Sequence, residues 1–148
     1  MDNPAPTAPT ACFTYGSLMS EDIMSAVTGV RAAHCGATLD GYCRHPVIGA
    51  EYPGMVGGAG HHVRGVLYLD LPPTAWPRLD RFEGGEYERR IVEVALDDGT
   101  RKPAWTYVFR DDLASRLDEG DWEFERFLRE GKARFVAEYV GFETLQPG

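Results

Sequence analysis

The strongest constraint on the fold is a pair of extended segments separated by a tight turn. Residues 87–96 and 102–110 flank the run Asp97-Asp98-Gly99-Thr100, which is typical of a hairpin connection. One face of the second segment is aromatic and is formed by Trp105, Tyr107 and Phe109. The sequence therefore predicts an antiparallel β-hairpin in the second half of the chain.

Three further extended segments are predicted upstream of the hairpin. Residues 12–15 form a short buried strand, and residues 63–70 alternate between apolar and polar side chains like a half-buried strand. Residues 33–48 are also extended, with Asp40-Gly41 as a turn signal in their middle. The glycine-rich residues 49–60 are predicted to form a loop.

Three helices are predicted among these strands. The first is capped by Ser20 and ends at Gly29, and the second carries an apolar stripe and ends at Gly84-Gly85. The last is capped by Asp121 and interrupted at Gly131. Short helices interspersed with strands, together with an antiparallel hairpin, predict an α+β fold rather than a doubly wound parallel sheet. Closure of the strands into a small barrel would leave no edge exposed.

The length predicts a single domain. The chain has 148 residues, of which 43% are hydrophobic, so it can bury a core without disulfides. Residues 1–10 contain three prolines and no apolar run, which predicts a disordered N-terminal tail before one domain over residues 11–145. No stretch approaches the roughly 18 apolar residues that span a bilayer, so no membrane association is expected.

The net charge indicates which kind of partner is excluded, and the cysteine content indicates the cellular compartment. The formal net charge is −8 and no basic cluster is present, which argues against nucleic acid as a partner. The three cysteines are odd in number, and the chain begins without a signal-peptide pattern. Both features favour a reducing, cytoplasmic location.

A strand-to-helix corner at Tyr15-Gly16-Ser17-Leu18 is the first segment that points to chemistry. Gly16 allows close approach of a ligand and tolerates positive φ. The N–H groups of Ser17, Leu18 and Met19 would then be unpaired donors, suited to a carboxylate or a carbonyl oxygen. The alternative is an ordinary strand–turn–helix corner.

The second such segment places Glu83 between an apolar helix stripe and a double glycine. Burial against an apolar wall raises the pKa of a carboxyl group, from about 4.3 toward the 6–7 that suits a general base at neutral pH. The alternative is a solvated residue at a helix end. Glu86 and Glu88, which follow, are expected to be surface charges paired with Arg89 or Arg90.

Taken in order along the chain, these motifs resemble the γ-glutamylcyclotransferase-like superfamily, and most closely its avirulence-induced plant and bacterial branch. The resemblance covers about residues 12–140. It is carried by Tyr15-Gly16-Ser17-Leu18, Tyr52-Pro53, Leu79-Asp80, Glu83-Gly84, Tyr87-x-Arg89, Thr106-Tyr107-Val108-Phe109 and Asp121-Trp122-Glu123-Phe124.

The resemblance implies a small mixed, largely antiparallel β-barrel flanked by short helices. It also implies a cavity with Glu83 as the catalytic acid/base, and its substrate-binding residues would be Tyr15, Gly16, Ser17, Leu18, Tyr52 and Tyr107. The implied reaction is cyclisation of a small γ-glutamyl compound to 5-oxoproline, with release of an amine and without a cofactor.

Four alternatives remain open at this stage. The first is a metal site, although the chain has no CxxC or HExxH spacing among its candidate ligands His34, Cys35, Cys43, His45, His61 and His62. The second is a cysteine nucleophile, although Cys12 has the character of a core residue. The third is a phosphate loop at residues 57–60, which lacks the following Lys-Ser/Thr. The fourth is a non-catalytic module of the same fold that binds a small acid or a protein. The sequence predicts no oligomeric state.

Overall fold

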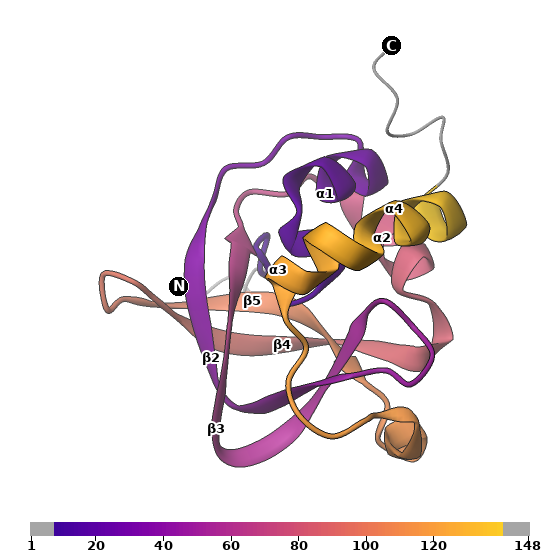
Figure 1. The fold of residues 1–148 in the computed structure, drawn as a ribbon. Coiled ribbons are helices and arrows are strands. Elements are labelled where there is room, and N and C mark those ends of the chain that lie inside the picture. The colour runs from indigo at the N-terminus through magenta and orange to yellow at the C-terminus, as the bar shows by residue number, and fades with distance from the viewer. Residues whose placement is uncertain (1–7, 141–148) are drawn as a thin grey trace, which may run out of the picture.

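The computed structural model describes residues 8–140. Most of the tail predicted over residues 1–10 lies outside this range, as does the end of the domain predicted over residues 11–145. Within the described range the strands form a barrel, and the four helices labelled in Figure 1 gather on one side of it. No helix in this range is long and apolar enough to cross a membrane.

Five strands close into a barrel in the order β1-β3-β2-β4-β5. Their bounds are β1 Cys12–Thr14, β2 His34–Pro46, β3 Pro53–Tyr68, β4 Tyr87–Leu96 and β5 Arg101–Phe109. All neighbouring pairs are antiparallel except β1 and β5, which are parallel and complete the ring. The α+β fold with a mixed, largely antiparallel barrel is therefore confirmed, and so is the hairpin of β4 and β5.

The predicted turn at Asp40-Gly41 and the predicted loop over residues 49–60 are both wrong in detail. β2 continues through Asp40-Gly41, where a bulge shifts its register against β3 and Gly41 takes a φ of +85°. The reversal comes later, between Pro46 and Pro53, so residues 53–60 belong to β3. A glycine in this stretch serves close packing, since a Cβ on Gly54 would lie 2.7 Å from the Phe109 ring.

Helical elements connect and cover the strands. They are η1 Ser17–Met19, α1 Glu21–Thr28, α2 Ala75–Glu83, η2 Gly84–Glu86, η3 Asp111–Arg116, α3 Phe124–Arg126, η4 Phe127–Gly131, α4 Lys132–Phe135 and η5 Val136–Val140. α1 follows Ser20 and ends at Gly29, and α2 ends at Gly84, as predicted. Both terminating glycines have positive φ, 82° and 76°.

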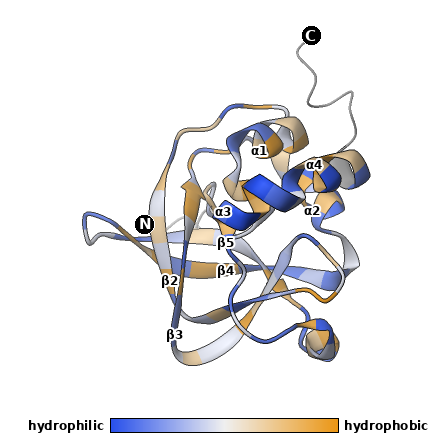
Figure 2. Cartoon of the chain, viewed as in Figure 1, coloured by the Kyte–Doolittle hydropathy of each residue, from blue (hydrophilic) through white to orange (hydrophobic). Residues whose placement is uncertain are grey.

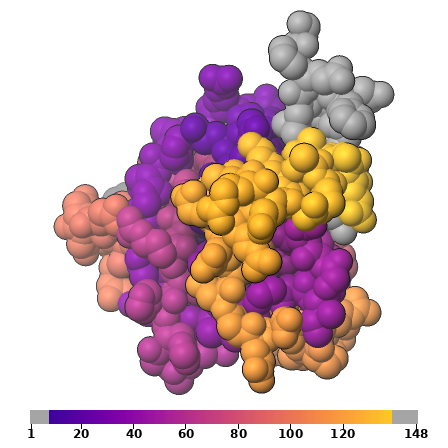
Figure 3. All heavy atoms as spheres, viewed as in Figure 1, coloured from indigo at the N-terminus to yellow at the C-terminus, as the bar shows by residue number. Residues whose placement is uncertain are grey.

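The C-terminal helical segment differs from the prediction at both named positions. Its first residue is Phe124, preceded by Glu123 rather than by Asp121 as the cap. Gly131 does not interrupt it, because the chain passes through wide π turns at η4 and η5 without leaving the helical path. In the space-filling view this orange-to-yellow segment lies across the front of the molecule, against the purple and magenta surface of the first half of the chain (Figure 3).

The apolar core has two parts that meet at the end of β1. One part draws on all five strands and fills the barrel, with Phe13 and Tyr15 among its members. The other joins the strands to the helices and includes Leu18, Leu79 and Phe135. Hydrophobic and hydrophilic residues are interspersed along strands and helices (Figure 2), as expected for elements with one buried face. The corner after β1 therefore lies at the junction of the two cores.

Candidate active site

One cavity opens at this junction, and every residue predicted for the site lines it. Counted out to its open mouth, and with the solvent at that mouth included, it holds about 590 Å³ of space free of protein atoms. The predicted residues in its wall are Tyr15, Gly16, Ser17, Leu18, Tyr52, Glu83 and Tyr107. Phe13, Thr14, Pro53, Phe82, Glu86, Tyr87 and Phe135 complete the lining.

The corner after β1 presents two unpaired backbone donors. The short helical turn η1 uses the Met19 N–H, which donates to the Gly16 carbonyl oxygen at 3.0 Å, so the prediction of a free donor at Met19 is wrong. The N–H groups of Ser17 and Leu18 have no acceptor within residues 8–140. Since both residues are buried, these donors need a partner from the cavity, either water or a ligand oxygen.

Gly16 is required for space rather than for positive φ. Its φ is −131°, so the positive φ that a glycine tolerates is not used here. A Cβ on Gly16 would lie 2.8 Å from Cδ of Pro53, which is too close for any side chain. The absence of a side chain lets the Tyr52-Pro53 segment pack directly against the donor corner.

Glu83 provides the acidic side of the cavity. It is the last residue of α2, its side chain is partly buried, and its carboxyl group has no hydrogen bond or ion pair among the described residues. Removal of this group from water without a compensating partner raises its pKa to about 8. The sequence argument expected burial to raise this pKa, and the structure gives the same direction.

The three predicted tyrosines form walls whose hydroxyls already contact the protein. The Tyr15 hydroxyl donates to the Tyr107 carbonyl oxygen at 2.5 Å, and the Tyr107 hydroxyl donates to Asp80 Oδ1 at 2.7 Å. The Tyr52 hydroxyl donates to Glu86 Oε1 at 2.8 Å. Burial raises the pKa of both Tyr15 and Tyr107. These hydrogen bonds fix the orientation of the three rings, and Tyr15 and Tyr107 remain neutral at ordinary pH.

Among the lining residues that sequence reasoning did not assign to the site, Glu86 and Tyr87 carry ionisable side chains. Glu86 was expected on the surface, but it lines the cavity and lies 3.4 Å from Arg116, whereas Glu88 pairs with Arg90 as expected. The Tyr87 hydroxyl donates to the Pro53 carbonyl oxygen at 2.6 Å. The available signal was spacing: in the η2 turn, residues three apart share a side, so Glu86 lies on the side of Glu83.

The described residues offer little support for a metal site, a cysteine nucleophile or a phosphate loop. Within residues 8–140 no group of three or more His, Cys, Asp and Glu side chains is placed to hold a metal ion. Cys12 is buried in the core, which raises the pKa of its thiol and disfavours the reactive thiolate. The glycine run at residues 57–60 lies on β3, whereas a phosphate loop precedes a helix.

Comparison with known proteins finds similar sequences over most of the chain. Residues 12–124 match the family described as "Gamma-glutamyl cyclotransferase, AIG2-like". The chain is 31% identical over 125 residues to the AIG2-like protein C of Arabidopsis thaliana, covering 84% of this chain and 72% of that protein.

Solved structures share the fold. A solution structure of an Arabidopsis thaliana protein superposes with a TM-score of 0.68 and 26% identity, covering 90% of this chain and 89% of the other. A structure titled gamma-glutamyl cyclotransferase gives a TM-score of 0.61 at 20% identity over 68% and 66% of the two chains, which is a likeness of fold. The chain belongs to the gamma-glutamyl cyclotransferase, AIG2-like family.

Proposed function

We propose that this protein is a γ-glutamylcyclotransferase that converts a small γ-glutamyl amine or peptide to 5-oxoproline and a free amine, with Glu83 as general acid and base. The observation that carries the proposal is an unpaired carboxyl group of raised pKa that shares one cavity with the free N–H groups of Ser17 and Leu18. The three cysteines are free, in keeping with a cytoplasmic site of action.

The pKa of Glu83 suits the first proton transfer. The substrate enters as an α-ammonium ion whose pKa is near ~8. Burial places the pKa of Glu83 at about 8 as well. The two values lie close together, so the ionised carboxylate can accept a proton from the ammonium group and later return it, as a group that serves as both base and acid must.

The remaining steps need only this shuttle and the backbone donors. The neutral α-amine attacks the γ-carbonyl carbon, a C–N bond forms, and the developing oxyanion accepts hydrogen bonds from Ser17 and Leu18. Protonated Glu83 then gives its proton to the leaving nitrogen as the original amide bond breaks and the carbonyl re-forms. The Glu83 carboxylate that results takes the second proton of the new ring nitrogen, which leaves the neutral lactam of 5-oxoproline. Nucleophile and electrophile belong to one molecule, so the rigid walls contribute by holding the substrate in its cyclising conformation.

The test is release of 5-oxoproline, measured by mass spectrometry with the purified protein. The substrates are a γ-glutamyl amino acid, a γ-glutamyl dipeptide and a γ-glutamyl group on the ε-amine of lysine. Glu83→Gln keeps the shape of the side chain and removes the shuttle, so turnover should fall at least about 100-fold while the variant remains folded. Glu88→Gln is the matched control, because Glu88 is exposed on β4, and it should leave turnover unchanged.

A non-catalytic binding module of the same fold is the rival, and the same material separates the two. Thermal stabilisation by the γ-glutamyl compounds without any 5-oxoproline would favour the rival. Full turnover in Glu83→Gln would show that another group is the base.

A further inference from the structure

A buried arginine lies directly behind the donor corner. The side chain of Arg44, on β2, is only 13% exposed. Its Nη1 donates to the Tyr15 carbonyl oxygen at 2.8 Å. Its Nε and Nη2 donate to the two carboxylate oxygens of Asp121 at 2.8 and 3.1 Å. One guanidinium thus joins the end of β1 to the segment that leads into the C-terminal helix.

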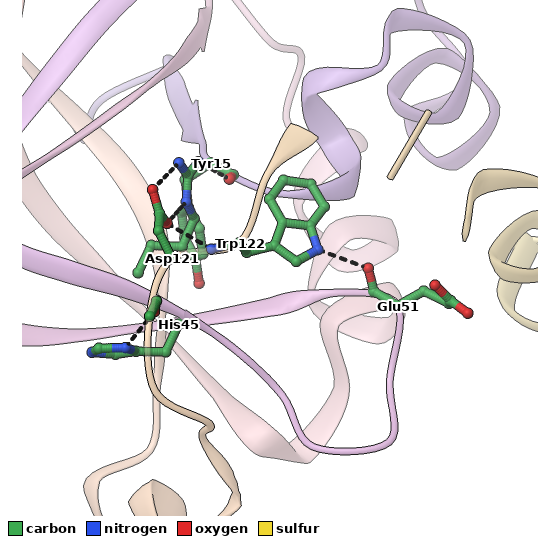
Figure 4. Close-up of polar contacts among 7 residues, drawn as sticks. Tyr15, His45, Glu51, Asp121 and Trp122 are labelled. Carbon is green, nitrogen blue, oxygen red and sulfur yellow. Dashed lines mark hydrogen bonds and ion pairs between the residues drawn. The ribbon is translucent and has the colours of Figure 1, made fainter. Parts of the chain in front are cut away.

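The same cluster reaches a third part of the cavity wall. The Arg44 guanidinium lies over the Trp122 ring, with Cζ 5.6 Å from the ring centroid. The indole Nε1 donates to the Glu51 carbonyl oxygen at 2.9 Å. In Figure 4 the Trp122 indole lies between the Tyr15 and Asp121 contacts on one side and Glu51 on the other. The neighbouring His45 also holds this segment, with Nδ1 2.9 Å from the Gly120 carbonyl oxygen.

Each of the three segments joined by this cluster contributes to the cavity. The Tyr15 peptide precedes the donors Ser17 and Leu18, and Glu51 precedes Tyr52. Trp122 packs on Phe127 with ring centroids 5.4 Å apart, and Phe127 packs on Phe135 with ring centroids 5.6 Å apart. Arg44 itself does not line the cavity. A residue in this place acts on a bound ligand only through the groups that it holds.

We propose that Arg44 is a positioning residue, which fixes the Tyr15–Gly16 peptide plane so that the following N–H groups of Ser17 and Leu18 face the cavity. A peptide unit is planar, so a carbonyl oxygen held on one side fixes the orientation of that unit, from which the corner starts. The units that carry the Ser17 and Leu18 N–H groups are held by bonds within the turn, from the Met19 N–H to the Gly16 carbonyl oxygen and from the Ser20 N–H to the Ser17 carbonyl oxygen, and the Tyr68 hydroxyl holds the Leu18 carbonyl oxygen. Arg44 adds the bond that orients the start of this turn relative to β2. The inference rests on the proposed function where it concerns turnover, but its geometric part stands without it.

The role needs the shape of arginine as well as its charge. Three of its N–H groups are used at once, in directions set by the planar fork. A lysine at this position has one nitrogen on a flexible stem. It can keep a charge near Asp121, but it cannot hold the carboxylate in two places and the Tyr15 carbonyl as well.

The kinetic test compares Arg44→Lys with Arg64→Lys. Arg64 makes a similar two-point contact with Asp97, but this pair is exposed and lies outside the cavity, so its variant should behave like the wild type. Arg44→Lys should lower kcat about 10- to 100-fold with a much smaller change in KM, because misplaced donors weaken the transition state more than the bound substrate. A rise in KM at unchanged kcat would contradict the positioning role.

A second measurement does not depend on turnover. In ¹⁵N-labelled protein without ligand, the amide signals of Ser17 and Leu18 should shift, broaden and exchange with solvent at least tenfold faster in Arg44→Lys than in the wild type. The amides of the β4–β5 hairpin should not change. If Ser17 and Leu18 keep their wild-type signals and exchange rates in a folded Arg44→Lys protein, the inference is wrong. If they change although no γ-glutamyl compound is ever turned over, the proposed function fails and the positioning of the corner stands.

Discussion

At the scale of single residues, the site depends on how two kinds of polar group are left without protein partners. The Ser17 and Leu18 amides are unsatisfied because η1 is too short to give them acceptors. The Glu83 carboxyl has no partner among residues 8–140 because α2 ends at a glycine pair, with apolar Phe82 beside it. Unpaired polar groups that are shielded from water cost stability, so these groups are satisfied by water or by a ligand in the cavity.

The pKa of Glu83 makes stability depend on pH in a defined direction. Its ordinary value is 4.5 and burial raises the pKa to about 8. Between these values the folded chain keeps a proton that the unfolded chain releases. The free energy of unfolding therefore falls with rising pH, by at most about 1.4 kcal/mol per pH unit, and levels off above about 8. Glu83→Gln, which is neutral at every pH, should lack this component.

Urea denaturation of both proteins at pH 5.5, 7 and 8.5 measures this difference. The wild type should lose more stability than Glu83→Gln across the series, and above pH 8 the variant should be the more stable of the two. The Glu88→Gln protein should follow the wild type, because that side chain is exposed. Parallel curves for the wild type and Glu83→Gln would mean that the Glu83 carboxyl is well solvated.

At the scale of elements, local sequence patterns predicted the hairpin turn and the helix ends, which depend on only a few neighbouring residues. The β4–β5 hairpin follows from its Asp-Gly turn, and α1 and α2 end at glycines that take positive φ, as their sequences predict. The donor corner and Glu83 were identifiable because each joins an apolar element to a glycine. The ordered set of motifs, through a family resemblance, supplied the barrel and the cavity.

Local sequence patterns could not predict contacts between segments that are distant in sequence. Asp40-Gly41 has the composition of a turn, but pairing with β3 makes it a bulge. Asp121 has the composition of a helix cap, but its carboxylate is used by Arg44, 77 residues away. Gly131 does not break its helix, because the surrounding apolar side chains are packed on the barrel. In each case a tertiary contact overrides a local preference.

The C-terminal helical segment owes its place to an aromatic cluster, and Phe135 is central to it. The centroid of this ring lies 6.3 Å from that of Tyr52, 5.8 Å from that of Phe82 and 5.6 Å from that of Phe127, and Phe135 is 3% exposed. Phe135→Ala should lower the free energy of unfolding by about 3–5 kcal/mol. It should also open the cavity wall and weaken binding of any cavity ligand. Leu128→Ala, on the same segment but 38% exposed, should cost less than about 1 kcal/mol.

Chemical denaturation and a thermal-shift titration with the γ-glutamyl compounds measure both effects. Equal losses of stability in the Phe135 and Leu128 variants would show that the segment is not docked through Phe135. Unchanged ligand affinity in a folded Phe135→Ala protein would remove the ring from the functional wall of the cavity.

At the scale of the whole molecule, the barrel is closed by its shortest strand. β1 has three residues, and its parallel contact with β5 is a single pair of residues, Cys12 and Trp105. Two hydrogen bonds reinforce the contact: the Trp105 N–H donates to the Ala11 carbonyl oxygen at 2.9 Å, and the Thr106 hydroxyl donates to the Phe13 carbonyl oxygen at 2.9 Å. The donor corner begins directly after this strand, so closure of the barrel and construction of the site share the same few contacts.

Thr106→Val tests this coupling, because it removes the reinforcing hydroxyl at nearly constant volume. Thr106 is fully buried, so the loss of its hydrogen bond should lower the free energy of unfolding by about 1–2 kcal/mol. Hydrogen exchange should accelerate at the amides of β1 and of the corner that follows it, while the β4–β5 hairpin keeps its protection. Thr38→Val on β2, a partly exposed position, is the matched control and should leave both quantities unchanged. Uniform acceleration across all strands would instead mean that the barrel opens only by global unfolding, with no separate weak point at β1. Local acceleration would mean that the Ser17 and Leu18 donors lie beside the part of the fold that opens most readily, where the loss of one hydroxyl disturbs the corner before it unfolds the protein.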